Sequence, residues 1–471
     1  MSSPAGEADL VVVANRLPFR RVTDDDGTVT WHPSPGGLVA ALAPSLADIK
    51  RMAWVGWPGD LDTPDEPVSP PEVDGVRLMS VPLSSDEKRL HYDGMSNGTL
   101  WPLYHDMVAQ PEFHRSWFEG YRRVNERFAD ATAKMVAEGG VVWIHDYQLQ
   151  LVPQMLRERR PDVRIGFFLH IPFPPEELFS QLPWRATLAC GILGSDLVGF
   201  QTPDGVANFT RVCTVRKLAE RVEPGLLATD DGRTVQVASF PIGIEHDRYE
   251  EAAREHSVTN AARDLRARLG QPHVVLLGVD RLDYTKGIDV RLRAFKELLA
   301  DGRLHASQVS MVQVAEPSRD DVDAYISLRA RVEQLVGEIN GDFGRVGFPV
   351  VHYIHQGQNF DQLMSMYRAA DVMLVTPFRD GMNLVAKEYV ASRYDDTGVL
   401  VLSEFAGAAH HLHDALLVNP HDIEGVKNAI VNAVEMAPDE VRSRMQALRG
   451  AVRDTTASDW AKSFLAAMPN A

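Results

Sequence analysis

Short runs made almost wholly of apolar residues recur along this chain, and most are followed by a turn and a helix-like segment. A strand that is apolar on both faces must be covered on both faces, and crossover helices between parallel strands provide that cover. The alternation therefore predicts an α/β fold with largely parallel sheets. The runs that we expect to form strands are residues 10–14, 141–145, 164–170, 196–201, 235–240, 273–279, 309–315, 352–354, 371–376 and 398–402.

Length and charge limit the classes of function. With 471 residues, of which 45% are hydrophobic, the chain can form two or more domains with full cores. Its formal net charge of −17 argues against a general nucleic-acid surface, so an anionic substrate would need a local basic cluster. The two cysteines form no disulfide framework, the first residues are no signal peptide, and no apolar run is of membrane-spanning length. We therefore expect a cytoplasmic protein that binds neither nucleic acid nor membrane.

The stretch of residues 371–388 has the pattern of a buried strand, a tight turn and the start of a helix. Asp380-Gly381 makes the turn, and Asn383 can cap the helix. Free N–H groups at a helix start attract phosphate, and Glu388 lies one and a half turns in, where a carboxylate could meet ribose hydroxyls. The stretch is a plausible nucleotide site, although the pattern alone also fits an ordinary strand-to-helix turn.

A basic loop follows the predicted strand 273–279. Arg281 and Lys286 are five positions apart in a turn, so both could reach one diphosphate, arginine as a fork and lysine as a point charge. On spacing alone, a solvated charged loop fits equally well.

In the first half of the chain, polar residues stand at the ends of predicted strands. Arg16 follows one strand, His145-Asp146 ends another, and His170 ends a third. Ligands bind at such strand ends in parallel sheets, whereas a single histidine there is more often structural. Two polar ends on separate strands of one sheet favour a site.

Paired glycines at Gly36-Gly37 allow backbone to approach a phosphate, but alone they also fit a flexible loop.

These motifs resemble those of the trehalose-6-phosphate synthases, which form glycosyltransferase family 20 and have the GT-B architecture. Residues 379–389 resemble the donor-site motif, and Arg281–Gly287 differs from the family pattern only in having Thr285 in place of serine. The resemblance extends from Asn15 to about Asn419. It implies two Rossmann-like domains that face each other across a cleft. It also implies retaining transfer of glucose from a nucleoside-diphosphate glucose to glucose 6-phosphate, giving α,α-trehalose 6-phosphate.

The resemblance also implies roles for individual residues, without a metal or cofactor. The residues that would bind the donor are Gly36, Gly37, Arg281, Lys286, Asp380, Gly381, Met382, Asn383, Leu384 and Glu388. The residues that would bind the acceptor are Arg16, Trp54, Tyr92, Trp101, Asp146, His170 and Arg319. The residues that would take part in catalysis are Asp146, His170, Arg281, Lys286 and Asp380.

The same resemblance gives expected domain limits: an acceptor-binding domain over residues 1–243, a nucleotide-sugar-binding domain over 244–448, and a C-terminal helix at 449–471 that packs back on the first domain. UDP-glucose is the expected donor, with ADP- and GDP-glucose as alternatives, and a homo-oligomer, dimer or tetramer, is expected. Two other functions stay open, a pseudo-glycosyltransferase that joins cyclitol units and a catalytically inactive sugar-nucleotide sensor.

The histidines at positions 410, 411 and 413 lack a carboxylate or cysteine at ligand spacing, so we interpret them as helix-end residues.

Overall fold

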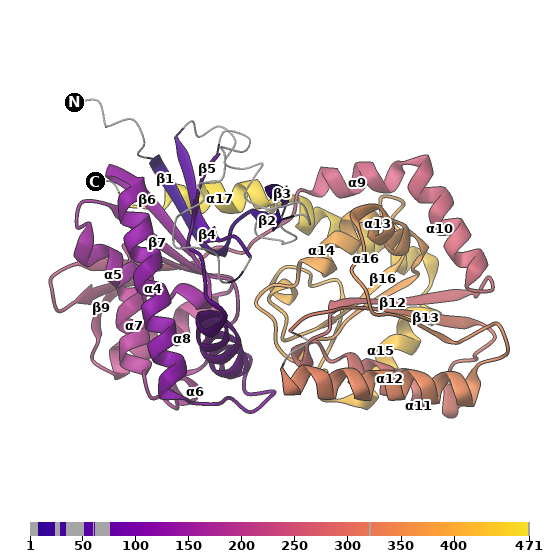
Figure 1. The fold of residues 1–471 in the computed structure, drawn as a ribbon. Coiled ribbons are helices and arrows are strands. Elements are labelled where there is room, and N and C mark those ends of the chain that lie inside the picture. Colours follow the sequence, from indigo (N-terminus) through magenta and orange to yellow (C-terminus); the bar gives the residue numbers. More distant parts are fainter. Residues whose placement is uncertain are drawn as a thin grey trace. The chain divides into compact units, whose positions relative to one another are not determined.

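The computed structural model describes residues 8–23, 29–33, 51–59, 61, 76–319 and 322–469. The chain forms two compact units, of which the first comprises Met1–Pro241 with Ala457–Ala471 and the second Ile242–Thr456. Each unit has a largely parallel sheet with helices packed against it (Figure 1). The predicted α/β class is therefore confirmed.

The sheet of the first unit has, among the described residues, nine strands in the order β5-β4-β1-β6-β7-β8-β11-β10-β9. All neighbouring strands are parallel except β9, β10 and β11, which pair antiparallel at one edge. The central strands are buried, as their apolar runs predict. Their bounds are β1 Ala8–Arg16, β4 Met52–Trp57, β5 Val76–Ser80, β6 Val136–His145, β7 Arg164–Leu169, β8 Leu197–Phe200, β9 Ala219–Glu223, β10 Leu226–Thr229 and β11 Thr234–Ser239.

Helices and one hairpin complete the first unit. The hairpin pairs β2 Phe19–Thr23 with β3 Val29–Pro33. The helical segments are α2 Ser85–Glu87, the π-helix η1 Lys88–Leu100, α3 Trp101–Tyr104, α4 Arg115–Met135, η2 Tyr147–Leu149, α5 Val152–Arg159, α6 Glu176–Phe179, α7 Arg185–Leu193, α8 Pro203–Val215 and α17 Ala457–Ala466.

The late helix α17, yellow in Figure 1, packs against the sheet of this first unit. The ring of Phe464 stacks on Trp143 of β6 at a centroid distance of 4.6 Å. Gly166 and Gly199 make room for the same phenylalanine, because a Cβ at either position would lie 2.7 Å from its ring. The last described helix is therefore part of the core of the first unit.

The second unit contains a six-stranded sheet, counted over the described residues, in the order β14-β13-β12-β15-β16-β17, and every pair in it is parallel. The strands are β12 Val274–Arg281, β13 Val309–Glu316, β14 Val351–Ile354, β15 Val372–Val375, β16 Val399–Ser403 and β17 Leu416–Val418. The helical segments are α9 His246–Arg254, α10 His256–Arg268, η3 Tyr284–Lys286, α11 Ile288–Ala300, α12 Asp323–Phe343, α13 Phe360–Ala369, α14 Leu384–Ser392, η4 Gly407–His410, α15 Ile423–Glu435 and α16 Pro438–Arg453.

The helices of the second unit lie on both faces of its sheet, with α11, α12 and α15 on one face and α13, α14 and α16 on the other (Figure 1). The sheet and the first group of helices share one apolar core, which includes Leu276, Phe295, Val332, Leu374 and Ile430. This cover leaves the carboxyl ends of the strands as the positions for polar loops.

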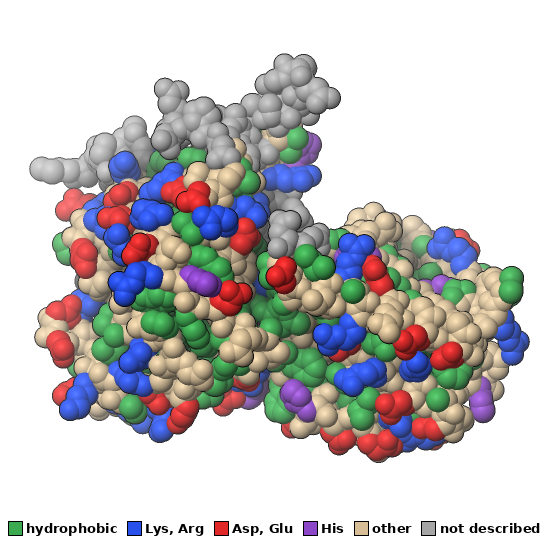
Figure 2. Space-filling view, turned by 60° about the horizontal axis from the view of Figure 1, so that its bottom comes forward, with side chains coloured by type: hydrophobic (Ala, Val, Ile, Leu, Met, Phe, Trp, Pro, Cys, Tyr) green, Lys and Arg blue, Asp and Glu red, His purple; other side chains and the backbone are tan. Residues whose placement is uncertain are grey.

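On the face that Figure 2 shows, acidic and basic side chains are interspersed rather than gathered by sign. No helix within the described ranges is long and apolar enough to cross a membrane.

Candidate active site

The predicted strand, turn and helix at residues 371–388 are β15, a loop and α14. Asn383 adopts a left-handed conformation with φ 75°, and its side-chain oxygen accepts a hydrogen bond from the backbone N–H of Ala386 at 3.3 Å, as the capping prediction requires. The loop packs closely against the segment after β16, because a Cβ at Gly407 would lie 1.9 Å from the carbonyl oxygen of Gly381. Gly381 and Met382 are buried in this loop, and Leu384 begins the helix.

The two predicted donor motifs meet at Asp380. Lys286 Nζ donates a hydrogen bond to Asp380 Oδ2 at 2.6 Å, and the Asn383 side chain donates to the same oxygen at 3.0 Å. Gly287, directly after Lys286, has φ 63°, and a Cβ there would lie 2.4 Å from the carbonyl oxygen of Thr376. Glycine at this position therefore allows the loop after β12 to approach the loop after β15.

A buried aspartate, Asp283, lies among the cations of the site. Its Oδ2 accepts a hydrogen bond from the Tyr325 hydroxyl at 3.1 Å and lies 3.6 Å from Arg319 Nη1, which also bonds to Tyr325. Burial alone would raise the pKa of this carboxyl, but Arg319, Arg281 and Lys286 outweigh burial and lower the pKa to about 2. The carboxylate of Asp283 thus compensates the charge of Arg319, which was predicted to bind the acceptor, and of Arg281 and Lys286, which were predicted to bind the donor.

A second buried ion pair supports the backbone of the same loop. The guanidinium of Arg291 is fully buried and lies 2.9 Å from Asp280 Oδ2. It also donates to the carbonyl oxygen of Lys286 at 3.1 Å and to the hydroxyl of Thr376 at 3.2 Å. Arg291 therefore ties the loop that carries Lys286 to the end of β15.

Glu388 lies on α14 between two tyrosines. Tyr367 donates to its Oε2 at 2.8 Å, and Tyr249 donates to its Oε1 at 3.2 Å. Burial raises the pKa of Glu388, and the two hydrogen bonds partly offset that rise. Neither tyrosine was predicted as a site residue, because each lies in a helix without a recognisable motif.

In the first unit, His145, Asp146 and His170 come together at the ends of β6 and β7. Asp146, with φ 75°, accepts a hydrogen bond from the backbone N–H of His170 at 3.1 Å. His145 Nδ1 and His170 Nε2 lie 3.1 Å apart. Burial and the neighbouring His170 hold the pKa of His145 well below its usual value, and burial lowers the pKa of His170 to about 3. Both imidazoles are therefore neutral near pH 7.

Three of the predicted acceptor residues gather around Trp57, at the ends of β1 and β4. The Arg16 guanidinium stands 4.0 Å from the Trp57 ring centroid, and Tyr92 lies 6.4 Å from the same ring. The indole N–H of Trp54 donates to the carbonyl oxygen of Arg16 at 3.1 Å. Trp57 was not among the predicted site residues, although it lies only three positions after Trp54, which was.

The remaining predicted residues are placed differently. Trp101 is buried at the start of α3 against His105 and Tyr147, at centroid distances of 4.2 and 5.6 Å. Arg281 is exposed at the end of β12. Gly36 and Gly37 lie outside the described residues.

The predicted residues are divided between the two units. Arg16, Trp54, Tyr92, Trp101, Asp146 and His170 belong to the first unit, and Arg281, Lys286, Arg319, residues 380–384 and Glu388 belong to the second. Over the part of the chain that the structure describes, no group of three or more histidine, cysteine, aspartate or glutamate residues is arranged to hold a metal ion.

Comparisons with known proteins agree with the motifs. Residues 8–470 match the sequence model of glycosyltransferase family 20. The trehalose-6-phosphate synthase of Mycolicibacterium gilvum is 52% identical over 476 residues, which cover 99% of this chain and 94% of that protein.

Solved structures are similar over nearly the whole chain. An alpha,alpha-trehalose-phosphate synthase (UDP-forming) from Burkholderia vietnamiensis superposes with a TM-score of 0.90 at 36% identity, covering 98% of this chain and 96% of that one. A UDP-forming synthase from Burkholderia xenovorans in complex with glucose-6-phosphate gives a TM-score of 0.88 at 35% identity, with 97% and 99% coverage. The predicted family and its GT-B fold are thus confirmed, and this chain belongs to glycosyltransferase family 20.

Proposed function

We propose that this protein transfers glucose from a nucleoside-diphosphate glucose to glucose 6-phosphate and forms α,α-trehalose 6-phosphate with retention at the transferred carbon. The observation that carries the proposal is the ion pair between Lys286 and Asp380 at the start of α14, in a chain of glycosyltransferase family 20. The similar structure described as UDP-forming supports UDP-glucose as the donor. The similar structure with bound glucose-6-phosphate supports that acceptor.

On the donor side, the diphosphate gains negative charge as the glycosidic bond breaks. Preorganised cations aimed at that charge lower the barrier, and Arg281 and Lys286 supply them in the proposed site. Backbone N–H groups at the start of α14, around Met382 to Leu384, add donors for a phosphate, with Gly36 and Gly37 as the predicted second loop. Asp380 accepts hydrogen bonds from hydroxyls of the transferred glucose, and Glu388 accepts hydrogen bonds from hydroxyls of the ribose.

On the acceptor side, Arg16 and Arg319 are the proposed ligands of the phosphate of glucose 6-phosphate, together with Trp54, Tyr92 and Trp101. The contacts of Arg319 with Tyr325 and Asp283 support this role, because they hold its guanidinium in place before the substrate binds. Asp146 and His170 face the hydroxyls of the acceptor sugar.

The proposed chemistry is a single front-face step. The bond between the glucose C1 and the leaving phosphate oxygen breaks while the acceptor hydroxyl attacks from the same face, and the leaving phosphate oxygen takes the acceptor's proton. His170 is neutral at pH 7, so it can orient the sugars through hydrogen bonds without adding charge.

The experiment is an initial-rate assay of the purified protein with UDP-, ADP- and GDP-glucose, glucose 6-phosphate as the acceptor, and NMR of the product linkage. We expect an α,α-linked product and the highest rate with UDP-glucose. Nucleotide binding without transfer to any acceptor would instead identify a sensor. Transfer only to a cyclitol phosphate would identify a pseudo-glycosyltransferase.

A further inference from the structure

Two tyrosine hydroxyls from different helices converge on the carboxylate of Glu388. Tyr367 of α13 donates to Oε2 at 2.8 Å, and Tyr249 of α9 donates to Oε1 at 3.2 Å. Within the described part of the chain, these hydroxyls are the hydrogen-bond donors that reach this carboxylate. Each carboxylate oxygen therefore receives one donor.

The rings that carry these hydroxyls are fixed by packing. Tyr249 meets Phe360 edge to face at a centroid distance of 5.4 Å, and the guanidinium of Arg248 stands 4.4 Å from the Phe360 ring. Tyr367 is fully buried and lies edge to face with Tyr389 at 6.3 Å. Because both rings are held, their hydroxyls are in position before any ligand binds.

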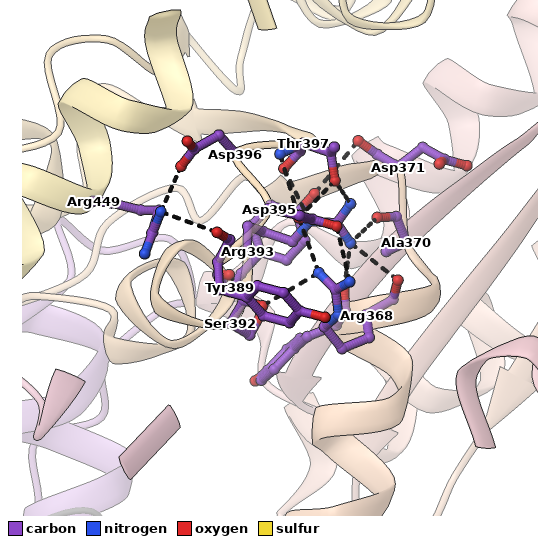
Figure 3. A network of polar contacts seen from close by, with 12 residues as sticks. Arg368, Ala370, Asp371, Tyr389, Ser392, Arg393, Asp395, Asp396, Thr397 and Arg449 are labelled. Carbon is purple, nitrogen blue, oxygen red and sulfur yellow. Dashed lines mark hydrogen bonds and ion pairs between the residues drawn. The ribbon is translucent and has the colours of Figure 1, made fainter. Parts of the chain in front are cut away.

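A polar network joins the two helices that carry Tyr367 and Glu388 (Figure 3). Arg393, directly after α14, donates to three carbonyl oxygens near the end of α13, those of residues 367, 368 and 370, each at 3.0 Å. Arg368 near the end of α13 donates to both oxygens of Asp395 at 3.0 and 2.8 Å. Cations at a helix C-terminus satisfy its free carbonyls, so this network fixes α13 against α14.

The hydrogen-bonding capacity of the carboxylate indicates what it is held for. An ionised carboxylate has about four lone-pair sites, two on each oxygen. The tyrosines occupy one site on each oxygen and leave one site on each oxygen. Two free acceptors in that arrangement fit two neighbouring hydroxyl groups, as on the 2′ and 3′ carbons of a ribose.

We propose that Tyr249 and Tyr367 are positioning residues that hold Glu388 for the ribose diol of the donor, so that they set the preference for ribose over deoxyribose. This inference rests on the proposed function, in which Glu388 binds the ribose. The hydroxyls also favour the ionised form of Glu388, which accepts at both oxygens, whereas a protonated carboxyl would have one acceptor fewer.

The test uses Tyr367→Phe and Tyr249→Phe, with Tyr389→Phe as the matched control. Tyr389 is a buried tyrosine on the same helix as Glu388, but its hydroxyl bonds to the carbonyl oxygen of Asp371 at 3.4 Å. Each protein is assayed with UDP-glucose and with its 2′-deoxyribose and 3′-deoxyribose forms. Melting temperatures show that each variant is folded.

We expect each of the two tyrosine variants to lose about tenfold in kcat/KM with UDP-glucose, the size of one hydrogen bond to a charged group. The loss with the deoxyribose donors should be much smaller, so the preference for ribose shrinks. Tyr389→Phe should keep the wild-type preference. An equal loss with all three donors, or a wild-type enzyme that shows no preference, overturns the positioning role.

A failure of the proposed function gives a different result, since the wild-type protein would then transfer no glucose. In that event, calorimetric binding of UDP, 2′-deoxy-UDP and 3′-deoxy-UDP to the same four proteins still tests the tyrosines. Weaker discrimination between these ligands in Tyr367→Phe and Tyr249→Phe than in Tyr389→Phe supports the inference, and equal discrimination overturns it.

Discussion

The ammonium group of Lys286 and the carboxylate of Asp380 lie 2.6 Å apart, although 94 positions separate these residues in the chain. The side chains are only 10% and 14% exposed, and Asn383 donates to the same carboxylate oxygen at 3.0 Å. A lysine ammonium has three N–H groups, so one can stay on Asp380 while the others bind a diphosphate. The pair thus orients Lys286 for the diphosphate that we propose it binds.

Replacement of Lys286 by alanine should lower kcat by about two to three orders of magnitude, because the loss of one preorganised charged donor costs about 3–4 kcal/mol of transition-state stabilisation. The measurement is steady-state kinetics with UDP-glucose and glucose 6-phosphate. Lys296→Ala is the control, since Lys296 bonds to Glu338 on the surface of the same unit and should leave kcat unchanged. A loss of tenfold or less in folded Lys286→Ala would reject the assignment.

Arg319→Ala should raise the KM for glucose 6-phosphate while nucleotide affinity stays near the wild-type value. A charge-assisted hydrogen bond to a phosphate contributes about 1.5–3 kcal/mol, so the KM should rise by at least about tenfold. Kinetics and nucleotide calorimetry together separate the two effects. Arg331→Ala, which removes an exposed arginine of α12 that pairs with Asp289, serves as the control. Equal weakening of both substrates would mean that Arg319 is misassigned.

Front-face transfer predicts that no covalent glycosyl-enzyme forms. A double-displacement enzyme needs a carboxylate nucleophile about 5–5.5 Å from its acid/base partner. Here Asp380 is bonded to Lys286, Asp146 accepts from the backbone of His170, and Glu388 accepts from two tyrosines.

Mass spectrometry of the enzyme with a slow 2-fluoro donor should therefore show the unmodified mass. Azide should not rescue Asp146→Ala or Asp380→Ala. A glycosylated carboxylate, or β-glucosyl azide from either variant, would establish a covalent intermediate instead. His170→Ala should slow the reaction and leave the product α,α-linked.

Removal of divalent metal ions by chelation should leave the transfer rate unchanged, because Arg281 and Lys286 supply the positive charge proposed to stabilise the leaving diphosphate. The measurement is the initial rate after dialysis against EDTA, compared with the rate after addition of Mg²⁺ or Mn²⁺. A loss of activity that one of these ions restores would contradict this prediction.

Stability should fall as the pH drops below about 6.5, because histidines are buried in the neutral form. His91, fully buried beside Asn15, has its pKa lowered by burial to about 3, whereas an unfolded histidine has a pKa of about 6.5. Below pH 6.5 the unfolded chain binds a proton that the folded chain does not, so the free energy of unfolding decreases toward pH 3.

For His91 the loss between pH 8 and pH 5 should be about 2 kcal/mol. Urea unfolding at the two pH values measures it, and His91→Gln, which can still donate to Asn15, should show a smaller difference. An identical pH dependence in the variant and the wild type would show that His91 does not carry this effect.

The ten expected strands could be located from the sequence because their signals are local, but β4, β5, β9 and β10 of the first sheet were not among them. The apolar run at 371–376 and the cap at Asn383 predicted β15 and α14, and both exist where expected. The family followed from motifs that lie in single loops. The roles of the site residues stay predictions.

The contacts inside the site could not be predicted, because they depend on distant segments. Asp283 lies in the motif that supplied Arg281 and Lys286 as predicted site residues, but Asp283 itself was not predicted. Its burial beside Tyr325 and Arg319 depends on how α12 packs. Tyr249 and Tyr367 come from helices whose patterns indicate only an apolar face. Their convergence on Glu388 is a property of the packed helices of the second unit.

The packing of α17 also has a consequence for synthesis. Phe464 fills the space above Gly166 and Gly199, so the core of the first unit includes residues that follow the whole of the second unit in the chain. Domains generally fold as units while the ribosome makes the chain from its N-terminus. Here the ribosome finishes residues 242–456 before it adds the helix that covers the first sheet. The first unit can therefore complete this part of its core only after the synthesis of the chain has ended.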